Sequence, residues 1–192
     1  MGLTVTYSSA SEFVTEYVEN LAAGGLFVAG KVDLDMLREI DVSIVAPGLP
    51  ELKIRARPVY VVDPNTARAT GRPLGTGMEI TTKPPGFDDA LRAHLMKLGK
   101  RREVAVMVGD VPGAARFGDA GFKLIPLEPL ESIAFALSDA LVPVIALIVP
   151  SGQLEAYTSV AREAGTMIAV YSPNRPVDVE DIVTSLDRVL AR

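Results

Sequence analysis

The sequence lacks several residue types, and each absence excludes a class of chemistry. Its 192 residues include no cysteine, which rules out disulfides, thiolate metal sites and a cysteine nucleophile. A single histidine leaves no metal site built from several histidines within one chain. The net charge of −5 argues against general binding to nucleic acid or to an anionic membrane. We therefore predict no metal site, no cofactor and no nucleic-acid partner.

Long hydrophobic runs are missing as well. The longest apolar stretch, residues 141–150, has the length of a strand, whereas a membrane-spanning helix needs ~20 apolar residues. The first residues show neither the basic region nor the apolar run of a signal peptide. These features predict a cytoplasmic protein without membrane insertion. At 48% hydrophobic residues, the chain can bury a sizeable core, in one large or two small domains.

The first half alternates apolar and polar residues, as strands with one buried face do. Glycine, proline and polar residues separate the alternating segments and predict turns, with a polar loop at residues 63–73. Apolar residues at helical spacing predict a helix over residues 10–20 and another that begins near Phe87 and buries Leu91, Leu95 and Leu98. The predicted strands cover residues 3–7, 26–29, 40–44, 52–62 and 75–81.

The turn that follows the first helix carries a recognisable pattern. Between Asn20 and Val28 the chain reads Asn-x-x-x-Gly-Gly-x-Phe-Val. This order resembles the signature turn of PilZ domains, small β-barrels with which many bacteria sense cyclic di-GMP. Residues 11–17 and 75–80 also resemble the PilZ-like group common in myxobacteria. The resemblance implies a PilZ-like antiparallel β-barrel over residues 1–100.

The resemblance also shows which ligand motifs are altered. PilZ domains that bind cyclic di-GMP carry Asp/Asn-x-Ser-x-x-Gly within the barrel. Asn20 and Gly25 match this motif, but Ala22 stands at the position of its serine. We therefore interpret Asn20, Ala22, Gly24 and Gly25 as the remnant of a PilZ motif.

The second PilZ ligand motif, Arg-x-x-x-Arg ahead of the barrel, is absent. Residues 1–30 contain no lysine, arginine or histidine, and they carry Glu12, Glu16 and Glu19. Arginine holds phosphates through paired, charge-assisted hydrogen bonds, which carboxylates cannot replace. We expect these three carboxylates to repel a dinucleotide, so the resemblance implies no cyclic di-GMP binding at the usual site.

Three cations form a stripe on the clearest predicted strand. Lys53, Arg55 and Arg57 follow one another at every second position, which puts them on the same side of the strand. Such a stripe can hold an acidic protein partner or a phosphate. The alternative interpretation is the solvated face of an antiparallel strand. We take this cationic stripe as the candidate partner or ligand surface.

The second half changes its period. Continuous apolar segments, typical of strands covered on both faces, alternate with segments of helical spacing. This order predicts an open parallel sheet of about four strands with flanking helices over residues 103–192. The predicted strands cover residues 104–108, 122–125, 142–149 and 166–171, and the last helix begins at Pro176.

Two segments of this half, residues 120–124 and 176–182, resemble the receiver domain of response regulators. The resemblance implies a reduced flavodoxin-like fold. Receiver chemistry needs an acidic cluster that holds Mg²⁺ and an aspartate that accepts phosphate. Here Asp110 is a lone remnant acid, the third strand ends at Pro150, and Arg175 is the nearest counterpart of the receiver's lysine. We therefore predict a degenerate, receiver-like domain.

The two resemblances predict a non-enzymatic bacterial signalling regulator that works through protein–protein contacts, with no catalytic residue. The myxobacterial likeness implies a role in motility or cell polarity, with protein partners of such a pathway and a homodimer as a further expectation. One alternative is a cyclic di-GMP effector with a non-standard pocket around Arg55 and Arg57. The other is an enzyme of the α/β half that uses Asp110, Ser151 or Ser172.

Overall fold

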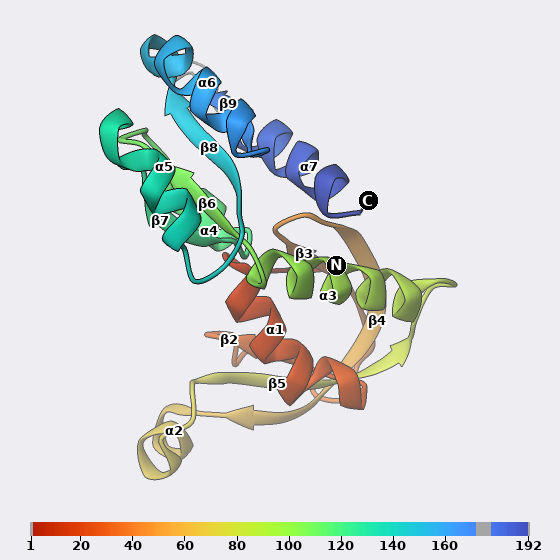
Figure 1. Cartoon of the computed structure of the whole chain (residues 1–192). Helices are drawn as coiled ribbons and strands as arrows, with labels where there is room; N and C mark the ends of the chain where they lie inside the picture. Colours follow the sequence, from red (N-terminus) through yellow and green to blue (C-terminus); the bar gives the residue numbers. More distant parts are fainter. Residues whose placement is uncertain (1, 172–177, 192) are drawn as a thin grey trace. The chain divides into compact units, whose positions relative to one another are not determined.

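The computed structural model describes residues 2–171 and 178–191 and is of the predicted α/β class (Figure 1). The chain divides into two compact units, residues 1–94 and 95–192. The division falls inside helix α3 (Phe87–Arg102), whereas the sequence places it after that helix. Among the described residues, no helix combines the length and the apolar character needed to cross a membrane.

The first unit contains a five-stranded mixed sheet with the strand order β1-β3-β4-β5-β2. Strand β1 runs parallel to β3, and the other pairs are antiparallel. The strands are β1 (Gly2–Thr6), β2 (Gly25–Ala29), β3 (Ile40–Ala46), β4 (Leu49–Val62) and β5 (Gly75–Thr82).

This arrangement corrects the prediction of a purely antiparallel β-barrel. In the part of the chain that the structure describes, β1 and β2 are the two edges of the sheet and do not pair with each other. Side-chain alternation identifies a strand, but it carries no information on the direction or partner of its pairing. Helix α1 (Ala10–Glu19) and β2 separate β1 from β3 along the chain, and such a long connection permits a parallel pair.

The core of the first unit forms between this sheet and the helices. Phe13 of α1 is fully buried, and its ring lies edge-on to Tyr7 at 5.6 Å and to His94 at 5.3 Å between centroids. On β4 the side chains of Leu52, Ile54 and Ala56 are buried, as the alternation predicts. The first turn of α1 is capped by Ser9, whose hydroxyl accepts the Glu12 N–H at 3.2 Å.

Helix α2 (Pro64–Thr70) corrects the prediction of a polar loop at residues 63–73. Asp63 precedes it, and its carboxylate accepts the N–H groups of Asn65 and Thr66 at 2.9 and 2.8 Å. Proline at the first helical position and Gly71 after the end, with φ 69°, complete the signals of a short helix. The segment contains no apolar stripe, so a search for periodicity overlooks it.

The second unit contains a parallel sheet of four strands with flanking helices, which confirms the prediction for this half. The strand order is β7-β6-β8-β9. The strands are β6 (Ala105–Val108), β7 (Lys123–Pro126), β8 (Val144–Pro150) and β9 (Met167–Tyr171), and the helices are α4 (Ala115–Asp119), α5 (Leu130–Asp139), α6 (Leu154–Glu163) and α7 (Asp178–Leu190). The predicted helix start at Pro176 lies outside the described residues.

Each face of this parallel sheet is covered by its own pair of helices. Val106 and Ile148 point to the side of α4 and α7, where Phe117 and Leu186 are fully buried. The neighbouring residues Met107 and Leu147 point to the other side, where Ile133 of α5 and Tyr157 of α6 enclose them. Because both faces are covered, the strands read as continuous apolar runs in the sequence.

The basic end of α3 differs from its predicted role as a solvated helix end. Lys97, Lys100 and Arg102 are exposed, but Arg101 is only 1% exposed. One of its Nη atoms donates to the carbonyl oxygen of Ala120 at 2.6 Å. On the same helix His94 is buried, whereas Leu95, which the sequence predicts to be buried, is only half-buried. Both positions fit the helical period, and the prediction chooses Leu95 because leucine is the more hydrophobic residue.

Candidate functional site

The cationic stripe lies on one face of β4, as its spacing predicts. Lys53, Arg55 and Arg57 are all exposed, while the residues between them are buried. The adjacent strands bring carboxylates to both arginines. Arg57 donates to Glu79 of β5 at 2.7 Å, and the two residues are paired in the sheet register. This cross-strand partner is separated by 22 positions in sequence and is invisible to a local pattern.

Arg55 has two acidic neighbours at the start of β3. Its Nη2 atom lies 3.0 Å from a carboxylate oxygen of Glu39, and its Nε atom lies 3.8 Å from Asp41. The Arg55 side chain is 52% exposed, so water and salt weaken both contacts. The two arginines of the stripe therefore do not present free positive charge, and a phosphate would compete with carboxylates for them.

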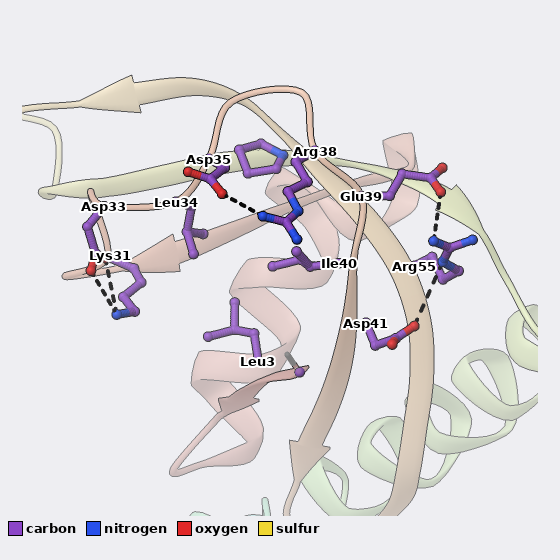
Figure 2. Close-up of a pocket in the computed structure, with 12 residues that line it drawn as sticks. Leu3, Lys31, Asp33, Leu34, Asp35, Arg38, Glu39, Ile40, Asp41 and Arg55 are labelled. Atoms are coloured by element: carbon purple, nitrogen blue, oxygen red, sulfur yellow. Dashed lines mark hydrogen bonds and ion pairs between the residues drawn. The ribbon is translucent and has the colours of Figure 1, made fainter.

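Arg55 also lines a pocket of about 290 Å³ beside the segment that connects β2 to β3. Figure 2 shows Arg38 of this segment near Asp35, with Leu34 and Ile40 close to the same space. Lys31 and Asp33 form a further ion pair at 3.1 Å. The lining thus combines paired cations and carboxylates with apolar side chains.

The charge of this pocket does not favour an anion. Three cationic side chains line it, Lys31, Arg38 and Arg55, and each lies within ion-pair distance of a carboxylate. Four acidic side chains line it too: Asp33, Asp35, Glu39 and Asp41. Its volume of about 290 Å³ lies just below the ~300–1,000 Å³ typical of ligand pockets. The arrangement suits a surface that exchanges ion pairs better than a phosphate site.

The connecting segment is held in an unusual conformation. Leu37 has φ 62°, a left-handed value that is rare for a bulky residue. Its N–H donates to the carbonyl oxygen of Pro58 on β4 at 2.9 Å, which ties the segment to the strand. The side chains of Met36 and Leu37 are exposed, so the segment presents apolar as well as charged groups.

The four residues that we interpret as a PilZ remnant lie in a tight turn between α1 and β2. The carbonyl oxygen of Asn20 accepts the N–H groups of Ala23 and Gly25 at 3.0 and 2.9 Å. Gly24 has φ 81°, which glycine adopts without strain, whereas Ala22 is exposed on the outside of the turn. In this chain these residues shape the turn that connects α1 to β2.

A buried carboxylate completes the turn. Glu16 is 9% exposed, and its two oxygens accept the Phe27 N–H at 2.8 Å and the side-chain amide of Asn20 at 3.2 Å. Burial raises the pKa of Glu16, and the two hydrogen bonds oppose this effect only in part. The Asn20 side chain therefore bonds to Glu16, four positions earlier in the sequence, a spacing at which helical side chains meet.

The Asn20–Gly25 turn lines a groove together with parts of β4 and β5, and none of the three cations of the stripe lines it. A hollow of about 270 Å³ is lined by Asn20 and Gly25 of the turn and by Glu79, the partner of Arg57. Tyr60, 45% exposed, forms its wall. We call the surface of Arg55, Arg57, Glu79 and Tyr60, all on β4 and β5, the outer face.

Glycine supports the aromatic side of the outer face. Tyr60 lies directly over Gly77 of β5, where a Cβ atom would collide with its ring. Phe27 of β2 lies in the same way over Gly75, its ring 2.7 Å from where a Cβ atom would stand. The two rings thus occupy space that side chains at these positions would fill, and both remain partly accessible.

The second unit places its predicted acid and serine after neighbouring strands. Asp110 is exposed after β6, and Ser151 is exposed after β8, which pairs with β6. Ser172 and Arg175 lie outside the described residues. Within residues 2–171 and 178–191, no group of three histidine, cysteine or acidic side chains could hold a metal ion.

Comparison with known proteins gives no guide to the function of this site: no protein-family model matches the chain, and no curated protein matches it.

Proposed function

We propose that this chain is a non-enzymatic bacterial regulator that binds protein partners through the outer face of its first unit. The observation that carries the proposal is the pairing of Arg55 and Arg57 with carboxylates of the neighbouring strands. A protein partner can exchange ion pairs with such a surface and cover Tyr60. A phosphate would instead have to displace the carboxylates that pair with Arg55 and Arg57. Tyrosine and arginine are enriched among the residues that dominate binding at protein interfaces.

The proposal includes a PilZ-like origin of the first unit and a receiver-like origin of the second. The Asn20–Gly25 turn at the start of β2 supports the first. The order β7-β6-β8-β9 supports the second, because it corresponds to 2-1-3-4 within the flavodoxin-like order 2-1-3-4-5. By analogy with the myxobacterial group, we propose that the process is motility or cell polarity, although a fold alone does not fix a function.

A charge exchange on the outer face tests the proposal. The double variant Arg57→Glu with Glu79→Arg keeps an ion pair but reverses its direction. We expect it to fold like the wild type and to lose the protein partners that the wild type captures from cell extract. Arg68→Glu on α2, an exposed position elsewhere in the same unit, is the matched control and should keep them. Retention of every partner by the exchanged variant would refute the proposal.

A second candidate function is that of a cyclic di-GMP effector with a relocated site. The observation in its favour is that Arg38 and Arg55 line the same pocket. Calorimetric titration with cyclic di-GMP at low salt distinguishes the candidates. The proposed function predicts no heat of binding. Binding that disappears in both Arg38→Ala and Arg55→Ala would establish the effector instead.

A further inference from the structure

The two edge strands of the five-stranded sheet differ in how their outward backbone groups are used. On β2, Gly25 and Phe27 donate their outward N–H groups to the Asn20 carbonyl at 2.9 Å and to the Glu16 carboxylate at 2.8 Å. Helix α1 and its turn therefore close this edge. Covering by a helix or loop is one of the ways in which proteins protect a sheet edge from further pairing.

Strand β1 forms the open edge. Beyond its end, Tyr7 donates its N–H to the carbonyl oxygen of Val45 on β3 at 2.9 Å, so odd-numbered residues direct their backbone groups to β3. The alternation of the strand turns the backbone groups of Gly2, Thr4 and Thr6 to the other side. There β1 has no neighbouring strand among the described residues.

The usual protections of an edge are missing from β1. Proteins protect an open edge with charged side chains, proline or a bulge. Residues 2–11 contain no charged residue and no proline, and β1 pairs with β3 without a bulge. The Thr4-Val5-Thr6 segment is rich in β-branched residues, which favour strands. The edge is suited to a further strand.

We propose that β1 pairs antiparallel with β1 of a second copy of this chain, around a two-fold axis at Thr4. In this register Thr4 faces Thr4 of the second copy and Gly2 faces Thr6, so every outward backbone group meets a partner. Leu3 comes to lie beside Val5 of the other copy and extends the apolar inner face.

Charge supports a second copy as the occupant. A two-fold interface brings each surface against itself, so a charged strand would face its own charge. The uncharged β1 avoids this repulsion, whereas it offers no charge with which to select a different, charged partner. The dimer goes beyond the proposed function, because β1 carries none of the four residues of the outer face.

Cysteine cross-linking of the full-length chain tests the register. The chain has no cysteine, so an introduced one is the sole thiol. Opposite residues of a hydrogen-bonded antiparallel pair have Cα atoms about 5.5 Å apart, within the about 4.4–6.8 Å span of disulfides. Thr4→Cys should therefore form a disulfide-linked dimer under mild oxidation. Thr6→Cys is the matched control. In this register Thr6 faces Gly2 of the second copy, so the two Thr6 residues are offset by four positions along the strands, about 14 Å.

We expect at least tenfold more cross-linked dimer, at twice 20.4 kDa, from Thr4→Cys than from Thr6→Cys. The substitution Thr4→Pro removes an outward N–H without touching the bonds to β3. We expect it to convert the dimer to a monomer in sedimentation while the monomer stays folded. A control, Thr4→Val, should remain dimeric.

Three results would overturn the proposal. Equal cross-linking of the two cysteine variants would indicate random collision. A dimer that survives Thr4→Pro would place the interface elsewhere, for example on α5, where Phe135 is 71% exposed. A chain that is monomeric at every concentration and gives no Thr4→Cys dimer would leave β1 open for an extended segment of another protein.

Discussion

Arg101 and Asp187 form a bidentate ion pair in the second unit. Nε and Nη2 of the guanidinium donate to the two carboxylate oxygens at 2.8 and 2.7 Å. The side chains are 1% and 18% exposed. The pair joins the last turn of α3 to α7 and lies beside the ring of Phe122, 5.4 Å from its centroid. A buried arginine held in this way makes the end of α3 part of the second unit.

Removal of one partner of this pair should destabilise the chain strongly. Asp187→Asn leaves the Arg101 charge buried with a neutral partner, and breaking a buried ion pair costs about 3–5 kcal/mol. Urea unfolding measures the loss. Arg102→Ala, at the exposed neighbouring position, is the control and should change stability by less than about 0.5 kcal/mol. Equal effects of the two substitutions would contradict the structural role of the pair.

Glu16 should make the stability of the first unit depend on pH. Burial raises its pKa above that of the unfolded chain. The folded state is therefore favoured below the unfolded pKa, and this contribution is lost as the pH rises through the folded pKa. Each unit between the two pKa values corresponds to about 1.4 kcal/mol.

The matched variant is Glu16→Gln, which keeps an oxygen that accepts the Phe27 N–H but cannot ionise. We expect it to gain stability relative to the wild type as the pH rises from acid to neutral. Thermal unfolding across this range measures the difference. A difference that stays constant with pH would show that Glu16 does not titrate as its burial implies.

The cap of α1 should contribute measurably to stability. Ser9→Ala removes the oxygen that accepts the Glu12 N–H, and the loss of such a cap costs about 1 kcal/mol. Ser11→Ala, two residues further along the chain and exposed, keeps the helix without touching the cap. Chemical denaturation should therefore separate the two variants, and a Ser9→Ala protein as stable as Ser11→Ala would contradict the cap.

Two glycines should respond to alanine in opposite ways. At Gly75 a Cβ atom would collide with the carbonyl oxygen of Val28 and with the ring of Phe27, which predicts a loss of about 1–3 kcal/mol. At Gly99, inside α3, a Cβ atom meets nothing within 4 Å, so Gly99→Ala should add up to about 1 kcal/mol. Melting temperatures measure both. A neutral Gly75→Ala would show that the Phe27 contact can rearrange.

Much of the secondary structure follows from local patterns. The alternation around Leu52 and Ile54 predicts β4, and the apolar run from Val104 predicts β6, because burial on one face or on both leaves a period that the sequence displays. The sequence also contains the start and end signals of α2. Hydrophobic periodicity does not reveal this helix, because Asp63, Pro64 and Gly71 enclose a segment with no buried side chain.

The sequence by itself determined where most strands and helices lie, that the second half is a parallel sheet with flanking helices, and which side of β4 carries the cations. Tertiary structure alone decided that β1 pairs parallel to β3, that Arg55 and Arg57 meet carboxylates, and that Arg101 is buried against Asp187. The physical reason is the separation in sequence between the residues that interact. Periodicity reflects the surroundings of consecutive residues, whereas pairing direction and ion pairs depend on residues that only the folded chain brings together.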